Sequence, residues 1–374
     1  MAGTEVRPAN SPLAKRSFVD LPFRLHGDDP AWVPPLRYAT YDRLSRRHPA
    51  SAHQRWALWT AHRRGEVVGR IAACRDSLFD ERQGERWAWL GFFDCVDDRQ
   101  VAASLFDVAL DWARRQGAEV AVGPGNFTTN DEIGLLVEGF EHPAVVMTLE
   151  NPPYYERLWT AAGWEPVMDL YGYQFLREQT ELSERQRRAL QRLRERSNVQ
   201  IREMRADDFE AEVGLFFDLY NQTWENNWGF VPMPEAEVRH LARQLKPLLI
   251  PRYAFGIERE GELVGVCVAL PDANKVMVRL RAGRLLPTGW ARLSWGIKRV
   301  KHVRIFALGV RPDAQSTGLG PLLYGEVVTR LYDDGMISGE ASWTLSTNFR
   351  INRQLEAMGA RHYKTWRLYK MPLS

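Results

Sequence analysis

The sequence predicts an α/β (α+β) fold in which one structural unit occurs twice along the chain. Short apolar runs bounded by glycine and polar residues indicate strands, and apolar residues recur at helical spacing between them. Residues 65–73 and 261–269 are similar in sequence, and each reads as a hairpin turn leading into a strand. Their matching glycines, Gly69 and Gly265, lie 196 positions apart. This self-similarity indicates two copies of a unit of about 180 residues.

A second pair of segments supports the repeat. Residues 151–164 and 348–360 each read as a short helix that ends at a glycine. The two glycines, Gly163 and Gly359, are again 196 positions apart.

The segments between these pairs match at a different spacing. Leu90-Gly91 and Leu308-Gly309 are 218 positions apart. The change places an insertion around residues 279–300 in the second copy and a compensating insertion around 122–143 in the first. Because loops tolerate insertions, we expect both at strand connections, where they are candidates for function-specific parts.

A strand, a turn and a helix follow one another directly in the second copy. Residues 305–310 are apolar and predict a buried strand, and apolar residues at 322–331 have helical spacing. The turn between them contains Gly318 and Gly320. Glycines let the backbone approach a ligand closely, and the first N–H groups of a helix have no partner within it. The segment therefore predicts an anion-binding site.

The spacing in this turn excludes two common phosphate-binding motifs. No Gly-Lys-Ser/Thr follows, as a P-loop requires, and the glycines do not fit Gly-x-Gly-x-x-Gly. The pattern Gln-x-x-Gly-x-Gly from Gln315 to Gly320 follows Val-Arg-Pro, and Asn348 stands eleven residues before Gly359. Together these features resemble the coenzyme A pyrophosphate loop and following helix of the GNAT acyltransferase superfamily.

The resemblance implies two tandem GNAT-like domains, each a mixed, mostly antiparallel sheet flanked by helices. We expect a disordered N-terminus at 1–15, a degenerate domain at 16–178, a charged linker helix at 179–197 and a coenzyme A-binding domain at 198–374. The arginines of the linker are interpreted as a solvated face with i,i+4 ion pairs, because no aromatic residues interleave with them to stack nucleic-acid bases.

The first copy lacks the diagnostic loop. In the alignment of the copies, Gln315, Gly318 and Gly320 correspond to Asp97, Gln100 and Ala102. Carboxylates at Asp94, Asp97 and Asp98 would repel a pyrophosphate, and the missing glycines would block its close approach. We therefore expect only the second copy to bind the cofactor.

The resemblance also implies the chemistry, in which an amine attacks an acyl-coenzyme A thioester directly. Backbone N–H groups of the loop would bind the pyrophosphate, and a strand N–H near Leu308 to Val310 would stabilise the oxyanion. The family pattern places a tyrosine acid where this chain has Leu355, so Tyr324, Tyr363 or Tyr369 is a candidate replacement. Glu340 and Glu225 are candidate bases, with a surface position as the alternative for each. The predicted coenzyme A-binding residues are Leu308, Val310, Gln315, Ser316, Thr317, Gly318, Leu319, Gly320, Asn348 and Asn352, with helix N-capping as the alternative for Asn348.

The composition limits the classes of partner and cofactor that we expect. The net charge of +3 gives no global argument for nucleic acid binding. The cysteines Cys74, Cys95 and Cys267 have no Cys-x-x-Cys spacing, so we expect reduced thiols in a cytoplasmic protein and neither disulfide nor metal. The first thirteen residues are polar and do not predict a signal peptide.

The acceptor side is less determined. Residues 279–301 are basic with large apolar residues interleaved, which predicts either a packed helix with a solvated basic side or peripheral contact with an anionic membrane. Our leading hypothesis is acyl-CoA-dependent transfer of an acetyl or longer acyl group to an amine, with a small-molecule or lipid amine as the acceptor. The alternatives are a long-chain acyltransferase making an amide lipid, as a ceramide synthase does, and a non-catalytic acyl-CoA sensor or scaffold. The acceptor amine, the acyl length and the oligomeric state are not predicted.

Overall fold

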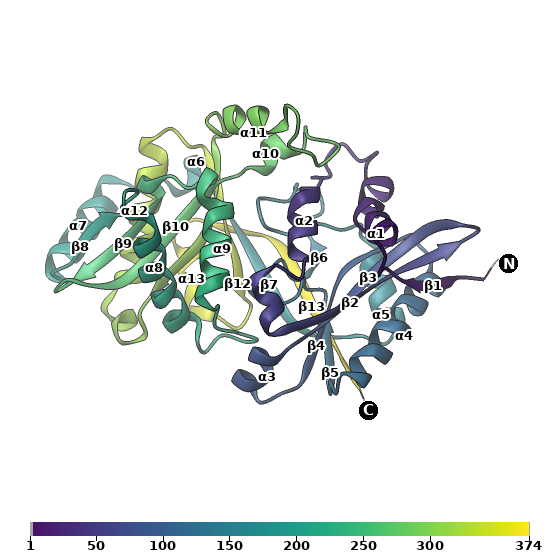
Figure 1. Cartoon of the computed structure of the whole chain (residues 1–374). Helices are drawn as coiled ribbons and strands as arrows, with labels where there is room; N and C mark the ends of the chain where they lie inside the picture. Colours follow the sequence, from purple (N-terminus) through teal and green to yellow (C-terminus); the bar gives the residue numbers. More distant parts are fainter. Residues whose placement is uncertain (1–2, 374) are drawn as a thin grey trace. The chain divides into compact units, whose positions relative to one another are not determined.

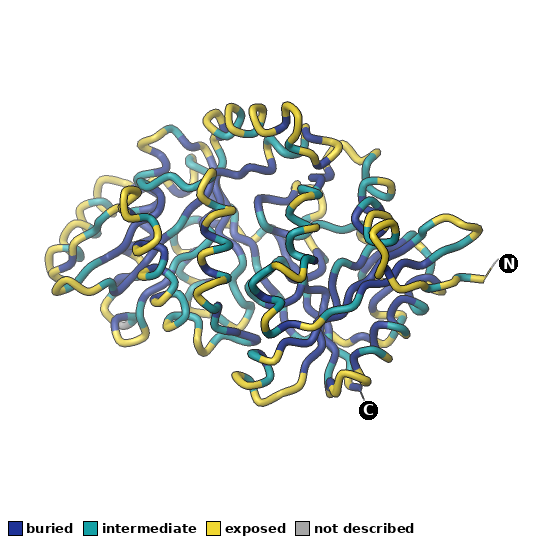
Figure 2. The backbone as a smooth tube through the Cα atoms, in the orientation of Figure 1, coloured by how far each residue is buried: buried dark blue, intermediate teal, exposed yellow. Residues whose placement is uncertain are grey.

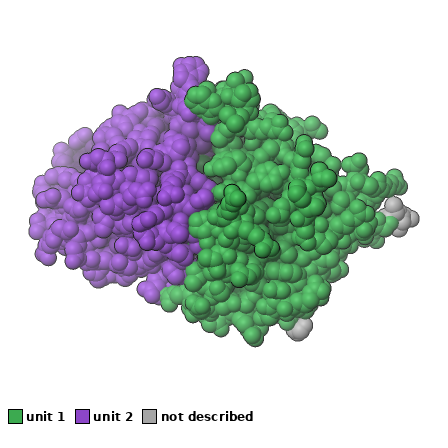
Figure 3. Space-filling view, in the orientation of Figure 1, with its two compact units in different colours: residues 1–170, 276–292, 364–374 green, residues 171–275, 293–363 purple. Residues whose placement is uncertain are grey.

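The computed structural model describes residues 3–373, apart from the side chain of Ser316, and divides the chain into two compact units. Unit 1 comprises Met1–Leu170, Val276–Arg292 and Lys364–Ser374, and unit 2 comprises Tyr171–Lys275 and Leu293–Tyr363 (Figure 3). Within the described residues, no helix combines the length and apolarity needed to cross a membrane.

Unit 1 is built on a mixed sheet (Figure 1). The strand order is β1 (Glu5–Pro8), β2 (Gln54–Arg63), β3 (Glu66–Asp76), β4 (Trp87–Cys95), β5 (Val120–Gly123) and β13 (Arg361–Pro372), and β6 (Leu135–Glu138) also pairs with β13. All pairs are antiparallel except β4 with β5. The helices are α1 (Pro12–Leu25), α2 (Arg37–Arg43), α3 (Ser77–Gln83), α4 (Arg99–Arg115) and α5 (Tyr154–Ala161), with a 3₁₀ turn at Pro49–Ala52.

Unit 2 repeats this arrangement. Its strand order is β7 (Glu165–Leu176), β12 (Ser338–Leu345), β11 (His302–Val310), β10 (Glu262–Pro271), β9 (Ala254–Arg259) and β8 (Gln200–Glu203). Strands β11 and β12 are parallel, whereas β8 to β11 pair antiparallel. The helices are α6 (Arg177–Thr180), α7 (Glu184–Arg196), α8 (Phe209–Trp224), α9 (Glu235–Leu245), α12 (Leu319–Asp333) and α13 (Phe349–Ala357), with 3₁₀ turns at Lys246–Leu248, Pro251–Tyr253 and Pro312–Thr317. The predicted fold class, with mixed sheets flanked by helices, is confirmed.

The units are not continuous stretches of chain. Strand β7 begins in unit 1 and ends in unit 2, and β13 begins in unit 2 and ends in unit 1. Helix α10 (Asn274–Met277) precedes the insertion of the second copy, which carries α11 (Gly289–Ile297), and residues 276–292 of this region belong to unit 1. Within unit 1, the backbone N–H of Arg37 donates to the carbonyl of Gly283 in this segment, and the Arg37 side chain donates to the carbonyl of Ala282. The predicted domain boundaries stay a prediction, because repeated copies and compact units are different divisions of the chain.

Each unit has its own apolar core between sheet and helices (Figure 2). In unit 1 the buried face of α4 presents Val101, Leu105 and Ala109 to the sheet. In unit 2 the corresponding helix is α12, which presents Leu323, Val327 and other buried residues. In both units, apolar residues at helical spacing pack one helix against the sheet. This shared packing is the physical basis of the sequence repeat.

Helix α7 lies within residues 179–197, which the sequence predicts as a linker. Ser183 caps it in a capping box with Gln186, and its arginines lie on a largely exposed surface. Leu190 and Leu193 pack against the core of unit 2, and α7 contacts α12. The helix is therefore part of unit 2 rather than a free connection.

Candidate active site

The two parallel strands at the centre of unit 2 separate and leave a cleft. Strands β11 and β12 are paired only from His302 opposite Ser338 to Ile305 opposite Ala341. The register of β10 with β11 shifts at this point and leaves Phe306 without a partner. A bulge adds local twist and bends the strand, so β11 turns away from β12 here.

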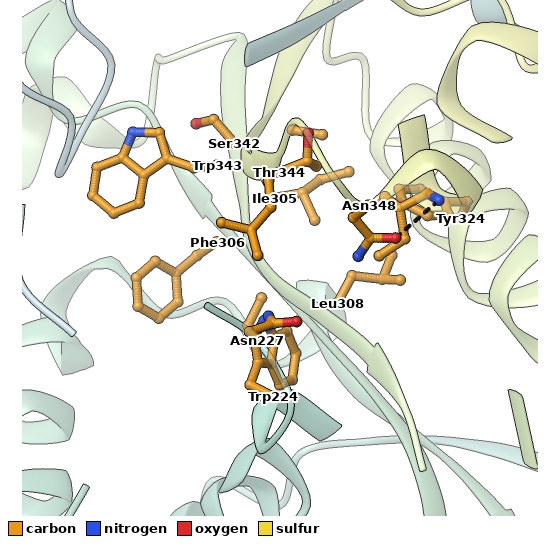
Figure 4. A pocket seen from close by; sticks show the side chains of 14 residues that line it. Trp224, Asn227, Ile305, Phe306, Leu308, Tyr324, Ser342, Trp343, Thr344 and Asn348 are labelled. Carbon is orange, nitrogen blue, oxygen red and sulfur yellow. Dashed lines mark hydrogen bonds between the residues drawn. The ribbon is translucent and has the colours of Figure 1, made fainter. Parts of the chain in front are cut away.

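The cleft has a volume of ≈ 530 Å³, including its part open to solvent, and its lining combines aromatic and aliphatic side chains with polar groups (Figure 4). Its residues come from β11, β12, α12, α13 and the end of α8. They are Trp224, Asn227, Ile305, Phe306, Ala307, Leu308, Tyr324, Ala341, Ser342, Trp343, Thr344, Leu345, Asn348 and Ile351. Concave apolar sites with a few polar groups are typical of small-molecule pockets.

The predicted anion-binding turn follows the same strand. Pro312–Thr317 is a 3₁₀ turn, and Gly318 then begins α12 with φ = +84°, a conformation that side chains other than glycine rarely adopt. The N-cap residue Gly318 has no side chain, and none of the described side chains caps α12. Its first amides are therefore available to an anionic ligand.

The polar side chains of the turn shape it from within. The Gln315 amide donates to the carbonyl of Val310 at 3.2 Å, and the Thr317 hydroxyl donates to the carbonyl of Ala314 at 2.6 Å. In this conformation, the predicted contribution of Gln315 and Thr317 to ligand binding comes from their backbone N–H groups. The predicted hydroxyl of Ser316 lies outside the described side chains.

Cationic and amide donors surround the turn. Arg259 at the end of β9 donates to the Thr317 hydroxyl at 3.4 Å, and its Nε is buried without a partner. Arg350 of α13 donates to the carbonyl of Gln315, and Gln354, one helical turn later, lies against Gly320. By contrast, Arg311 is paired with Glu262 and Asp313, which raise the pKa of its guanidinium.

The predicted asparagines mainly order the connection between β12 and α13. Asn348 caps α13 by accepting from the N–H of Ile351 at 3.3 Å, and it also lines the cleft. Asn352 donates to the carbonyl of Leu345 at 3.0 Å and is buried. The structure thus shows the N-capping alternative for Asn348. Because Asn348 also lines the cleft, contact between this residue and a ligand stays a prediction.

A buried polar cluster lies beside the cleft. Glu340 is 1% exposed and accepts hydrogen bonds from the hydroxyls of Ser342 and Tyr363. Arg304 is equally buried and lies opposite Glu340 in the strand register. It donates from Nε to the Ser342 hydroxyl at 3.2 Å and from Nη2 to the Ser342 carbonyl at 3.0 Å. Of these residues, only Ser342 lines the cleft.

The remaining predicted catalytic residues lie in different surroundings. Tyr324 lines the cleft from α12, and burial, followed by the nearby Cys267, raises the pKa of its hydroxyl. Glu225 is the exposed C-cap of α8 and is not among the residues that line the cleft, although the adjacent Trp224 is. Leu308 lines the cleft, whereas the Val310 side chain packs in the core.

Sequence reasoning identified Glu340 but missed the roles of Ser342 and Arg304 in its surroundings. The available signal was polarity inside apolar strands: Arg304 interrupts the run from Val303 to Val310, and Ser342 stands two residues after Glu340. Residues at i and i+2 of a strand share a face, so this pattern indicates a polar stripe on one side of the sheet.

The equivalent position in unit 1 is closed. The Asp98 carboxylate caps α4 by accepting from the N–H of Gln100 at 2.8 Å and of Val101 at 3.2 Å. Where β4 and β5 separate, Asn126 accepts from the N–H of Phe92, and the N–H of Gly125 donates to Leu90. The helix amides are thus occupied by the chain's own carboxylate, and the gap between the strands is filled by residues of the first-copy insertion.

Comparisons with known proteins agree with this geometry. Residues 214–353 match the acetyltransferase (GNAT) family model. A Caulobacter vibrioides (strain NA1000 / CB15N) protein named bacterial ceramide synthase is 35% identical over 380 aligned positions, covering 100% of this chain and 98% of the relative. Protein YghO of Escherichia coli (strain K12) is 34% identical over 361 residues, covering 95% and 92%.

Solved structures show the same fold. A tandem GNAT protein from the clavulanic acid biosynthesis pathway superposes with a TM-score of 0.58 at 12% identity, covering 100% of this chain and 99% of that one. Together with the full-length relatives and the matched family model, the splayed strands and the glycine turn lead to one conclusion: this chain is an acyltransferase of the GNAT superfamily.

Proposed function

We propose that this enzyme transfers an acyl group from acyl-coenzyme A to an amine, and that the amine belongs to a lipid. The observation that carries the proposal is the continuity of the cleft with the anion-binding turn, because β11 lines the first and leads directly into the second. A ligand with a phosphate at one end and a reactive thioester at the other fits such a site.

The strand geometry suits the thioester. Beyond Ile305, β11 has no pairing with β12, so backbone groups on that side can bind the pantetheine arm and the thioester carbonyl. An N–H aimed at the carbonyl oxygen would stabilise the oxyanion that forms when an amine attacks. The glycine turn and the start of α12, from Gln315 to Gly320, would bind the pyrophosphate.

Two observations favour a lipid acceptor over a small polar amine. The relative named bacterial ceramide synthase aligns over the whole chain, and ceramide is an amide of a lipid amine. Large apolar side chains, among them Phe306, Leu308 and Trp343, line part of the cleft. Acetyl transfer to a small amine is the second candidate.

Calorimetric titration with acetyl-CoA and palmitoyl-CoA, with mass spectrometry of the products from a panel of amines, tests the proposal. We expect tighter binding of palmitoyl-CoA and amide formation with long-chain amines. Gly318→Glu is expected to abolish binding, because it adds a negative charge and a side chain at a positive φ. Binding without thiol release would support the sensor alternative, and no binding of either thioester would exclude the proposal.

A further inference from the structure

The buried Glu340 accepts a hydrogen bond from Ser342, a residue of the cleft lining. We propose that Glu340 acts as the base of acyl transfer through Ser342, and that Arg304 is the positioning residue that orients this relay. The inference rests on the proposed acyl-CoA-dependent N-acylation and assigns the residues that remove the proton from the amine.

Glu340 is too enclosed to reach an acceptor directly. Its side chain belongs to a residue that is 1% exposed, and it is absent from the cleft lining. Ser342, two residues along β12 on the same face, lines the cleft and donates its hydroxyl proton to the carboxylate. Ser342 is therefore the contact between the carboxylate and a bound amine.

Arg304 gives the hydrogen-bond chain a direction. Its Nε donates to the Ser342 oxygen at 3.2 Å, and its Nη2 donates to the Ser342 carbonyl at 3.0 Å. A guanidinium is a donor only, so the serine hydroxyl must accept from Arg304 and point its own proton elsewhere. The Glu340 carboxylate is the acceptor in that direction.

The second oxygen of Glu340 is held by Tyr363. The tyrosine hydroxyl donates to Glu340, and burial followed by the charge of Glu340 raises its pKa, so it stays protonated. Tyr363 is not among the cleft-lining residues. The same carboxylate thus has one hydroxyl partner on a residue that lines the cleft and one on a residue outside that lining.

The proton balance of the step is simple. The amine nitrogen forms a bond to the thioester carbonyl carbon and loses one proton to the Ser342 oxygen while the serine proton moves to Glu340. Collapse of the tetrahedral intermediate breaks the carbon–sulfur bond, and the electron pair leaves on sulfur as the coenzyme A thiolate. Ser342 ends as it began, and Glu340 holds the proton until product release.

Ser342→Ala and Tyr363→Phe form a matched pair, because each removes one hydroxyl that donates to Glu340. We expect Ser342→Ala to lower kcat by about 100-fold, the usual contribution of a positioned base. The KM for acyl-CoA and its calorimetric affinity should remain unchanged. Tyr363→Phe should lower kcat by no more than about tenfold. Equal losses in the two variants would overturn the relay and leave a structural role for the cluster.

Two further variants guard against misfolding as the explanation. Ser342→Thr retains a hydroxyl and should recover most of the activity lost in Ser342→Ala. Glu340→Gln combined with Ser342→Ala should lose no more kcat than either single variant, because groups of one relay act as a unit. Additive losses would contradict the proposal.

A nucleophilic serine is the rival explanation for the same hydrogen bonds. Intact-protein mass spectrometry after mixing with acyl-CoA alone is expected to show no adduct, and an acyl adduct on Ser342 would overturn the relay. If the parent protein forms no amide with any amine, the proposed function fails. If it forms amides but the matched variants behave alike, only the relay fails.

Discussion

In unit 2, individual polar residues are buried close to the point where strands β11 and β12 separate. Arg304 and Glu340 point to one face of the sheet, while their neighbours Ile305 and Ala341 pack in the core on the other. Charged groups are rarely this buried unless they are paired and hydrogen-bonded. Their burial beside the cleft is the residue-scale indication of chemistry.

Glu340 could be selected from the sequence because a carboxylate stands within an apolar strand. Its partners could not, because Arg304 is 36 positions earlier and Tyr363 is 23 positions later in the chain. Only strand register decides which side chains meet across β11, β12 and β13.

Tyr324 is the best-placed candidate for the acid that protonates the leaving thiolate. It lines the cleft, and its raised pKa keeps the hydroxyl protonated well above neutral pH. We expect Tyr324→Phe to lower kcat by about tenfold, a modest loss because a thiolate (reference pKa about 8.5) leaves readily without help. Steady-state kinetics with unchanged acyl-CoA affinity would confirm this.

A loss of acyl-CoA binding in Tyr324→Phe would instead assign the hydroxyl to ligand binding. The raised pKa also fixes the sign of the pH dependence: below about pH 10 this donor should cause no alkaline loss of kcat.

At the scale of elements, the two strand–turn–helix units differ at the start of the helix, where the sequence predicts that one copy binds an anion and the other excludes it. Helix α12 begins at Gly318 without a side-chain cap, whereas α4 begins at Asp98, whose carboxylate takes up its first amides. The sequence predicted repulsion by Asp94, Asp97 and Asp98. The structure adds that each is neutralised by an arginine, through pairs with Arg70, Arg157 and Arg63 respectively.

The basic segment 279–301 is the element best suited to a membrane surface. It exposes Leu286 (77%), Trp290 (56%) and Trp295 (64%), and it contains seven Lys or Arg residues and no Asp or Glu. Exposed aromatic residues among cations are typical of interfacial segments on anionic lipid. We propose that it brings the enzyme to the membrane that holds its acceptor.

Vesicle co-sedimentation tests this proposal. The double variant Leu286→Ser/Trp290→Ser should weaken binding to phosphatidylglycerol vesicles by about tenfold or more, because each substitution removes apolar surface that the lipid would bury. Added salt should weaken binding of the parent protein as well. Leu13→Ser, at another residue that is 77% exposed, is the matched control and should have no effect. Equal binding to neutral phosphatidylcholine vesicles would contradict the proposal.

At the scale of the whole molecule, β13 makes the two halves of the chain interdependent. Its last part belongs to unit 1, where Tyr369 to Pro372 pair with β5 and Trp366, Leu368 and Tyr369 are fully buried. The end of β7 belongs to unit 2, where Tyr173 and Phe175 are core residues. Neither sequence copy alone contains all the strands of a unit.

Truncation after Tyr363 should therefore damage unit 1, most of which lies within residues 1–170. We expect loss of the cooperative thermal transition and rapid proteolysis within residues 1–170, because a buried strand and its aromatic side chains are removed. A synthetic peptide of residues 364–374 added in trans should restore part of the protection. A truncated protein that melts as the full chain does would contradict this dependence.

The sequence by itself determined the repeat, the fold class and the position of the glycine turn that is predicted to bind an anion, because these depend on local periodicity and on glycines close together in the chain. It also showed which copy lacks the turn. The tertiary structure alone decided that Asp98 caps the degenerate helix, that β13 returns to unit 1, and that Ser342 connects Glu340 to the cleft. These features depend on register between distant strands, and no local pattern specifies which residues face one another across a sheet.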